Sequence, residues 1–69
     1  MIEVDARGLS CPEPVMLANK AVKAHPGEKI CVYVDEACAR INVEKFGRSK
    51  GRQVSVTEKG SDEYEIDIE

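Results

Sequence analysis

Hydrophobic and polar residues alternate in four short segments of the chain and follow a helical spacing in two longer ones. Alternation with a period of two predicts strands at residues 2–6, 29–35, 54–56 and 64–68. Apolar residues three or four positions apart predict helices at 12–24 and 36–50, and Gly51 is a suitable end for the second. The order of elements is therefore βαβαββ.

The polar members of the strands indicate how the elements are layered. Two βα units require parallel, right-handed crossovers, and residues 59–62 form the turn of a closing antiparallel hairpin. The polar residues that alternate with the apolar ones are Glu3, Asp5, Ser55, Thr57, Glu65 and Asp67. One sheet face is then open to water, and both helices must cover the other. The predicted fold class is α/β, a two-layer sandwich with a four-stranded mixed sheet and two helices on one face.

The composition is that of one small globular domain, residues 1–69. Of the 69 residues, 42% are hydrophobic and 33% are charged, which is enough apolar material for a core. No apolar run approaches the roughly 20 residues that cross a bilayer. No basic-then-apolar signal segment opens the chain, so a cytoplasmic location is expected. The net charge of −3 argues against a domain built to hold nucleic acid, and RNA binding through the basic stretch from Arg40 to Arg52 is a minor alternative.

The three cysteines, Cys11, Cys31 and Cys38, are an odd number at spacings of 20 and 7 residues. This pattern argues against a secreted disulfide framework. With one histidine and no C-x-x-C pair, the chain lacks ligands for a tetrahedral zinc site, so no metal is expected. Cys31 is interpreted as a small strand residue. Cys38 is either a small residue at a helix start or a resolving thiol for Cys11.

Cys11 is the candidate nucleophile. It follows the first strand and directly precedes a helix that begins at Pro12, where the helix dipole and unpaired N–H groups favour the thiolate. Pro12 and Pro14 stiffen the first turn, and Gly8 gives the approaching loop backbone freedom. The alternative is a packed structural cysteine, but such a residue would more naturally lie within the apolar stripe of the helix.

Two acids accompany Cys11 in this prediction. Glu13 lies in the first helical turn, where it is exposed to a partner and negative charge suits the dipole. Asp35 follows the second strand, which ends at the same sheet edge as the first if the two are parallel neighbours. The single histidine, His25, is at the far end of the helix, which excludes a Cys–His pair. Thiol exchange or sulfur transfer is then the natural chemistry, because it needs only an accessible thiolate and a donor.

One stretch of the chain carries a family signature, D-A-R-G-L-S-C-P-E-P-V-M at residues 5–16. Its combination D-x-x-G-L-x-C-P-x-P, which contains the CPxP motif, lies between a strand and a helix. It resembles the TusA/SirA/YedF family of small sulfur carriers, and the similarity runs through the whole chain. The resemblance implies a sheet with strand order 1-2-4-3, whose fourth strand is antiparallel to the rest. It also implies that Cys11 carries a persulfide in the rigid setting of Pro12 and Pro14.

The same resemblance implies a function and partners. In such proteins the cysteine takes sulfane sulfur from a cysteine desulfurase or rhodanese-type donor and passes it to an acceptor protein. The chain is then a sulfurtransferase-type persulfide carrier rather than a stand-alone catalyst, and no cofactor or membrane contact is expected. Two other classes stay open. One is a regulatory or interaction module that uses the open polar face, and the other is thiol–disulfide exchange through Cys11 and Cys38.

Overall fold

A computed structural model of the protein describes residues 1–10 and 12–69, and the predicted nucleophile Cys11 lies outside the described residues. The described chain forms six elements: β1 (Ile2–Asp5), α1 (Glu13–Ala24), β2 (Ile30–Val34), α2 (Ala37–Ser49), β3 (Val54–Gly60) and β4 (Glu63–Ile68). The predicted order βαβαββ is confirmed. Only β3 extends more than two residues beyond its predicted range.

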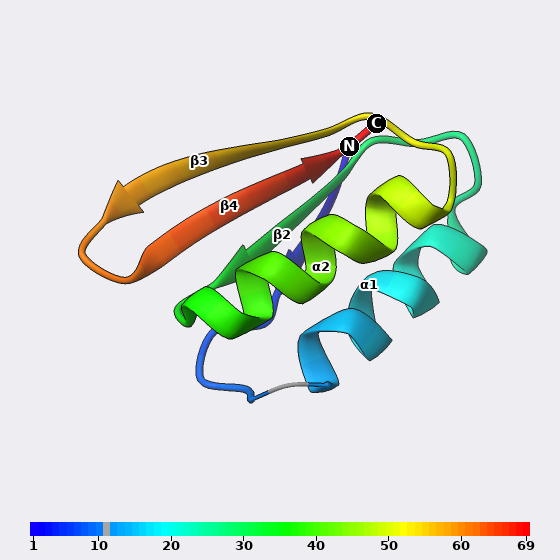
Figure 1. Ribbon diagram of the computed structural model, residues 1–69. Helices are drawn as coiled ribbons and strands as arrows, with labels where there is room; N and C mark the ends of the chain where they lie inside the picture. The colour runs from blue at the N-terminus through cyan, green and yellow to red at the C-terminus, as the bar shows by residue number, and fades with distance from the viewer. Residues whose placement is uncertain (11) are drawn as a thin grey trace.

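The four strands form one mixed sheet in the order β1-β2-β4-β3. β1 pairs in parallel with β2, and β4 runs antiparallel to both of its neighbours. Both helices pack against the same face of this sheet (Figure 1). The predicted two-layer sandwich and its strand order are therefore confirmed.

The core lies between the sheet and the two helices. The register sets apolar residues of neighbouring strands side by side, with Ile30 next to Ile68 and Val32 next to Ile66. The fully buried apolar residues that form the core are Ala6, Ala18, Ile30, Val32, Val34, Ala39, Val43, Ile66 and Ile68. Each buried valine or isoleucine contributes roughly 1.5–3 kcal/mol relative to an exposed one. These residues are the apolar members of the alternating and helical patterns, so the pattern itself determines which faces meet.

The closing hairpin is tighter than the sequence predicts. β3 continues to Gly60, which pairs with Glu63 of β4, so the turn is reduced to Ser61 and Asp62. Asp62 takes a positive φ of 59°, a conformation that aspartate tolerates better than most side chains. An ion pair between Lys59 Nζ and Glu65 Oε1, at 3.3 Å, joins the two strands just before the turn. Cross-strand pairing therefore extends into residues whose composition is typical of a loop.

Helix α2 approaches the sheet most closely at Gly47. A Cβ atom at this position would lie 2.5 Å from Val54 Cγ2 and 3.3 Å from Ile68 Cγ1. Side chains on two strands therefore occupy the volume that any larger residue would need. Glycine here permits the helix to pack directly onto the end of the sheet, at the cost of some helix propensity.

We expect Gly47→Ala to destabilise the protein. Alanine gains about 1 kcal/mol over glycine within a helix. However, the clash with Val54 forces packed groups to move, and overpacking of this kind costs about 1–3 kcal/mol. The free energy of unfolding, measured by urea denaturation, should fall by about 1 kcal/mol.

A second substitution tests the stated cause. Val54→Ala removes the methyl group that the new Cβ would strike. The double variant G47A/V54A should therefore lose less free energy of unfolding than the two single variants lose together, because the two residues are in direct contact. Strict additivity, or a stabilised Gly47→Ala variant, would contradict the close packing at this position.

Candidate functional site

The carboxyl ends of β1 and β2 lie together at one edge of the sheet. The two strands are parallel neighbours with Asp5 in register with Tyr33. The pairing continues beyond β1, because the Ala6 N–H donates to the Tyr33 carbonyl oxygen at 2.8 Å. The loop that precedes α1 and the residue that follows β2 are therefore neighbours, as expected for ligand and catalytic groups in such sheets.

Gly8 and Asp35 are in direct contact at this edge. The Gly8 N–H donates to both carboxylate oxygens of Asp35, each at 3.0 Å. Gly8 has a φ of +83°, a left-handed conformation that costs other residues about 1–2 kcal/mol. Both residues were predicted to support the site, and the structure adds that they bond to each other. A charge-assisted hydrogen bond thus fastens the loop to the sheet.

Arg7 and Asp5 form a local ion pair within the same loop. The guanidinium donates from Nε to Asp5 Oδ1 at 3.0 Å and from Nη2 to Oδ2 at 3.1 Å, and the Arg7 N–H also donates to Oδ1 at 3.1 Å. The side-chain hydrogen bonds from Arg7 are the main cause that lowers the pKa of Asp5 below its ordinary value, and the pKa of Arg7 rises for the same reason. The positive charge of Arg7 is therefore already balanced at this edge.

The start of α1 is shaped by its prolines. Pro12 is the N-cap residue and exposed, and Pro14 in the first turn is fully buried. The Glu13 N–H donates to the Ser10 carbonyl oxygen at 2.9 Å, and the Met16 N–H donates to the Pro12 carbonyl oxygen at 3.1 Å. Glu13 itself is exposed in the first turn, as predicted. In sequence, Cys11 falls between the two ends of this turn, but it lies outside the described residues.

An apolar depression adjoins the start of the helix. It is lined by Leu9, Glu13, Met16 and Leu17. Met16 is a large apolar side chain that is 63% exposed, whereas Leu9 packs partly against the core. Apolar surface bordered by an acid is the composition of many protein contact sites.

Of two other predicted positions, His25 lies away from this edge, whereas Cys38 is in the helix that begins just after β2 ends. His25 is the C-cap residue of α1, at the opposite end of the helix, where its Nδ1 lies 3.3 Å from a Glu28 carboxylate oxygen. His25 is therefore far from the first turn of α1, where a Cys–His pair would need it. Cys38 lies in the first turn of α2 and is exposed, and Asn42 Nδ2 lies 3.7 Å from its sulfur.

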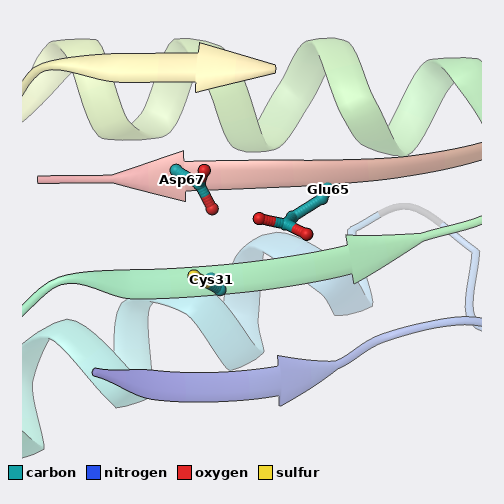
Figure 2. A group of neighbouring side chains, drawn as sticks. All are labelled: Cys31, Glu65 and Asp67. Carbon is teal, nitrogen blue, oxygen red and sulfur yellow. The ribbon is translucent and has the colours of Figure 1, made fainter. Parts of the chain in front are cut away.

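Cys31 lies on the sheet face that the helices leave uncovered, yet its side chain is only 1% exposed. It points from β2 toward the carboxylates of Glu65 and Asp67 on β4 (Figure 2). Burial, a hydrogen bond with Asp67 and the negative charges of Asp67 and Glu65 together raise the pKa of the Cys31 thiol to about 11, and burial is the largest of these causes. At neutral pH this sulfur is therefore a protonated thiol and a poor nucleophile.

Sequence reasoning missed this grouping of a thiol with two acids. Cys31 was interpreted as a small strand residue, and the two acids were counted as polar residues of the open face. The feature that would have revealed the grouping is the cross-strand register, in which Cys31 is directly opposite Asp67. Only the order and alignment of β2 and β4 bring the three residues together.

Comparison with known proteins finds similarity over almost the whole chain. A family model described as Sulfurtransferase TusA matches residues 2–69. The crystal structure of a SirA-like protein from Desulfitobacterium hafniense superposes with a TM-score of 0.91 at 34% sequence identity, and the match covers 99% of this chain and 95% of that one. Within residues 1–10 and 12–69, neither helix is long and apolar enough to cross a membrane.

We expect Asp35→Ala to loosen the loop before α1. Removal of the carboxylate leaves the Gly8 N–H without its acceptor and should lower the free energy of unfolding by about 1–2 kcal/mol. Hydrogen exchange of the Gly8 amide, followed by NMR, should accelerate more than that of amides in the core. Glu36→Ala is the matched control, because Glu36 is the adjacent acid and its side chain makes no capping hydrogen bond. Equal exchange rates in the two variants would show that Asp35 does not hold the loop.

The raised pKa of Cys31 predicts a loss of stability in alkali. The unfolded thiol loses its proton near the ordinary pKa of 9.0, whereas the folded thiol keeps it until about 11. Between these values the folded state binds the extra proton, so the free energy of unfolding falls as pH rises and levels off above the folded pKa. Urea denaturation at several pH values should show this fall in the wild type and a shallower one in Cys31→Ser. Identical slopes would contradict the assignment.

Proposed function

The chain belongs to the TusA family of sulfurtransferases, and from this we propose that it is a sulfur-relay carrier whose Cys11 holds sulfane sulfur as a persulfide. The observation that carries the proposal is the Cys-Pro-Glu-Pro motif, which follows the loop after β1 and runs into the first turn of α1, in a chain matched over residues 2–69 by the family model. Pro12, Pro14, Gly8, Glu13 and Asp35 support this cysteine.

The proposed transfer is a thiol exchange with no net redox change. The Cys11 thiolate attacks the outer sulfur of a donor persulfide, and a new sulfur–sulfur bond forms on Cys11. The sulfur–sulfur bond of the donor breaks, and its electron pair leaves on the donor thiolate. In the second step a thiolate of the acceptor protein attacks the outer sulfur on Cys11 and releases the Cys11 thiolate. Each step exchanges one thiolate for another, so neither a cofactor nor a separate base is consumed.

The surroundings of the motif suit such a step. The positive end of the α1 dipole and the N–H groups of its first turn favour a negatively charged sulfur over a neutral thiol. The Gly8–Asp35 hydrogen bond holds the preceding loop, and the buried Pro14 anchors the following turn. These two attachments hold the described residues on either side of position 11, which supports the proposal that the motif is presented to a partner at a low entropy cost.

The partners in this proposal are proteins. The donor is a cysteine desulfurase or a rhodanese-type protein, and the acceptor is a protein thiol. The exposed Met16 and the neighbouring Leu9 provide apolar area for a transient contact, and Glu13 supplies a charge at its border. A contact of this composition fits a carrier that must bind two partners in turn and release both.

The proposal predicts one transferable sulfur atom on Cys11. Incubation of the protein with a cysteine desulfurase and free cysteine should add the mass of one sulfur to the intact chain, and peptide mapping should place that sulfur on Cys11. Cys11→Ser should lose the adduct, because a hydroxyl group cannot form the persulfide.

Cys38→Ser is the matched control for this experiment. It also removes one thiol, but it should keep the adduct. Absence of any adduct in the wild type, or an equal adduct in Cys11→Ser, would overturn the proposal. A loss of two hydrogens with a Cys11–Cys38 disulfide in place of an added sulfur would support thiol–disulfide exchange instead.

A further inference from the structure

The uncovered face of the sheet holds a compact group of potential metal ligands. Cys31 Sγ and one carboxylate oxygen each from Glu65 and Asp67 lie within 4.8 Å of one another. Figure 2 shows the three side chains on the same side of the sheet, between β2 and β4. The register explains the grouping, because Cys31 is directly opposite Asp67, and Glu65 is two residues before Asp67 on the same face.

Cys31 is buried and the two acids are half-buried, so the group is not a chance meeting of exposed side chains. The Cys31 side chain is 1% exposed. Oδ1 of Asp67 is shut off from solvent, and within the described part of the chain it accepts no hydrogen bond. A buried carboxylate oxygen without a partner is unfavourable, and such atoms often mark the place of an ion. Glu65 is held beside the group by Lys59 at 3.3 Å.

We propose that Cys31, Glu65 and Asp67 bind a zinc ion on the open face of the sheet. One thiolate and two carboxylates suit a borderline cation such as Zn²⁺, whereas Mg²⁺ and Ca²⁺ take oxygen ligands. Typical bonds are about 2.3 Å for zinc to sulfur and about 2.0–2.2 Å for zinc to oxygen. Ligand atoms that start within 4.8 Å of one another need only small side-chain rotations to reach these values.

Binding is a ligand exchange without oxidation. The Cys31 thiol releases its proton to water, its sulfur forms a bond to zinc, and the ion gives up water molecules to the two carboxylates. A water molecule would supply the fourth ligand from the face of the sheet that the helices leave open. Asp67 Oδ1 then acquires the partner that it lacks. Counting cysteines and histidines alone misses such a site, because two of its three ligands are carboxylates.

The ion would connect the two central strands of the sheet. Cys31 belongs to β2 and both acids belong to β4, so a shared ion would cross-link segments that are more than thirty residues apart in sequence. The Cys31, Glu65 and Asp67 group is also separate from the loop before α1. That loop is held by the Gly8–Asp35 hydrogen bond at the carboxyl end of β2. The zinc site therefore does not rest on the sulfur-carrier proposal.

Cobalt titration of the double variant C11S/C38S tests the site, because Cys31 is then the only thiol in the chain. One equivalent of Co²⁺ should produce a near-ultraviolet thiolate-to-cobalt absorption band, and one equivalent of Zn²⁺ should abolish it. Adding Cys31→Ser should remove the band, and adding Asp67→Asn should weaken Zn²⁺ binding at least tenfold. At a hundredfold excess of Zn²⁺ over its dissociation constant, the melting temperature should rise by about 10–20 °C.

Glu58→Gln is the matched control, because it removes one negative charge from an exposed side chain of β3 outside the group. It should leave the band and the Zn²⁺ affinity unchanged. Far-ultraviolet circular dichroism confirms that each variant is folded, and Asp67→Asn keeps the test informative if Cys31→Ser does not fold. A missing band in C11S/C38S, or an affinity that falls equally in Glu58→Gln and Asp67→Asn, would overturn the zinc site. Because Cys11 is absent throughout, either result leaves the sulfur-carrier proposal untouched.

Discussion

Parallel pairing of β1 with β2 is the interaction on which the candidate site depends. It continues past the strands through the hydrogen bond from Ala6 to Tyr33, so both segments leave the sheet at the same edge. Only for this reason can Asp35 accept a hydrogen bond from Gly8, although the two residues are 27 positions apart. The loop of the family signature thus obtains a long-range support that its own residues do not supply. A local motif gains a fixed position from the topology around it.

The arrangement of both helices on one face has a second consequence. The other face carries the polar half of each strand pattern, and several of its described side chains pair with one another. Tyr33 donates to Glu3 at 3.1 Å, which is the main cause that raises the pKa of Tyr33 to about 12, and Lys59 pairs with Glu65. Side chains in such rows can enclose a small residue, which explains how Cys31 is buried on a face without a covering layer.

Much of this fold follows from the sequence, because alternation and helical spacing record which side of each element meets the core. The order of elements and the two layers can be predicted in this way. The missed features depend on pairing between distant segments. The length of β3 follows from its register with β4, the space at Gly47 from packing against Val54, and the partner of Gly8 from strand order. Periodicity contains no information on register, so these contacts appear only in three dimensions.

The environment of Cys31 explains why this thiol is poorly suited to sulfur transfer. Sulfur transfer requires a thiolate, and the acidic surroundings of Cys31 disfavour that form by burial and by the repulsion of two carboxylates. A helix N-terminus acts in the opposite direction, because its unpaired N–H groups and dipole stabilise negative charge. A thiol in the middle of an acidic sheet and a thiol at a helix start therefore differ in nucleophilicity at the same pH. The same carboxylates that suppress nucleophilic attack by Cys31 can attract a cation, so the open face of the sheet favours cation binding over sulfur transfer.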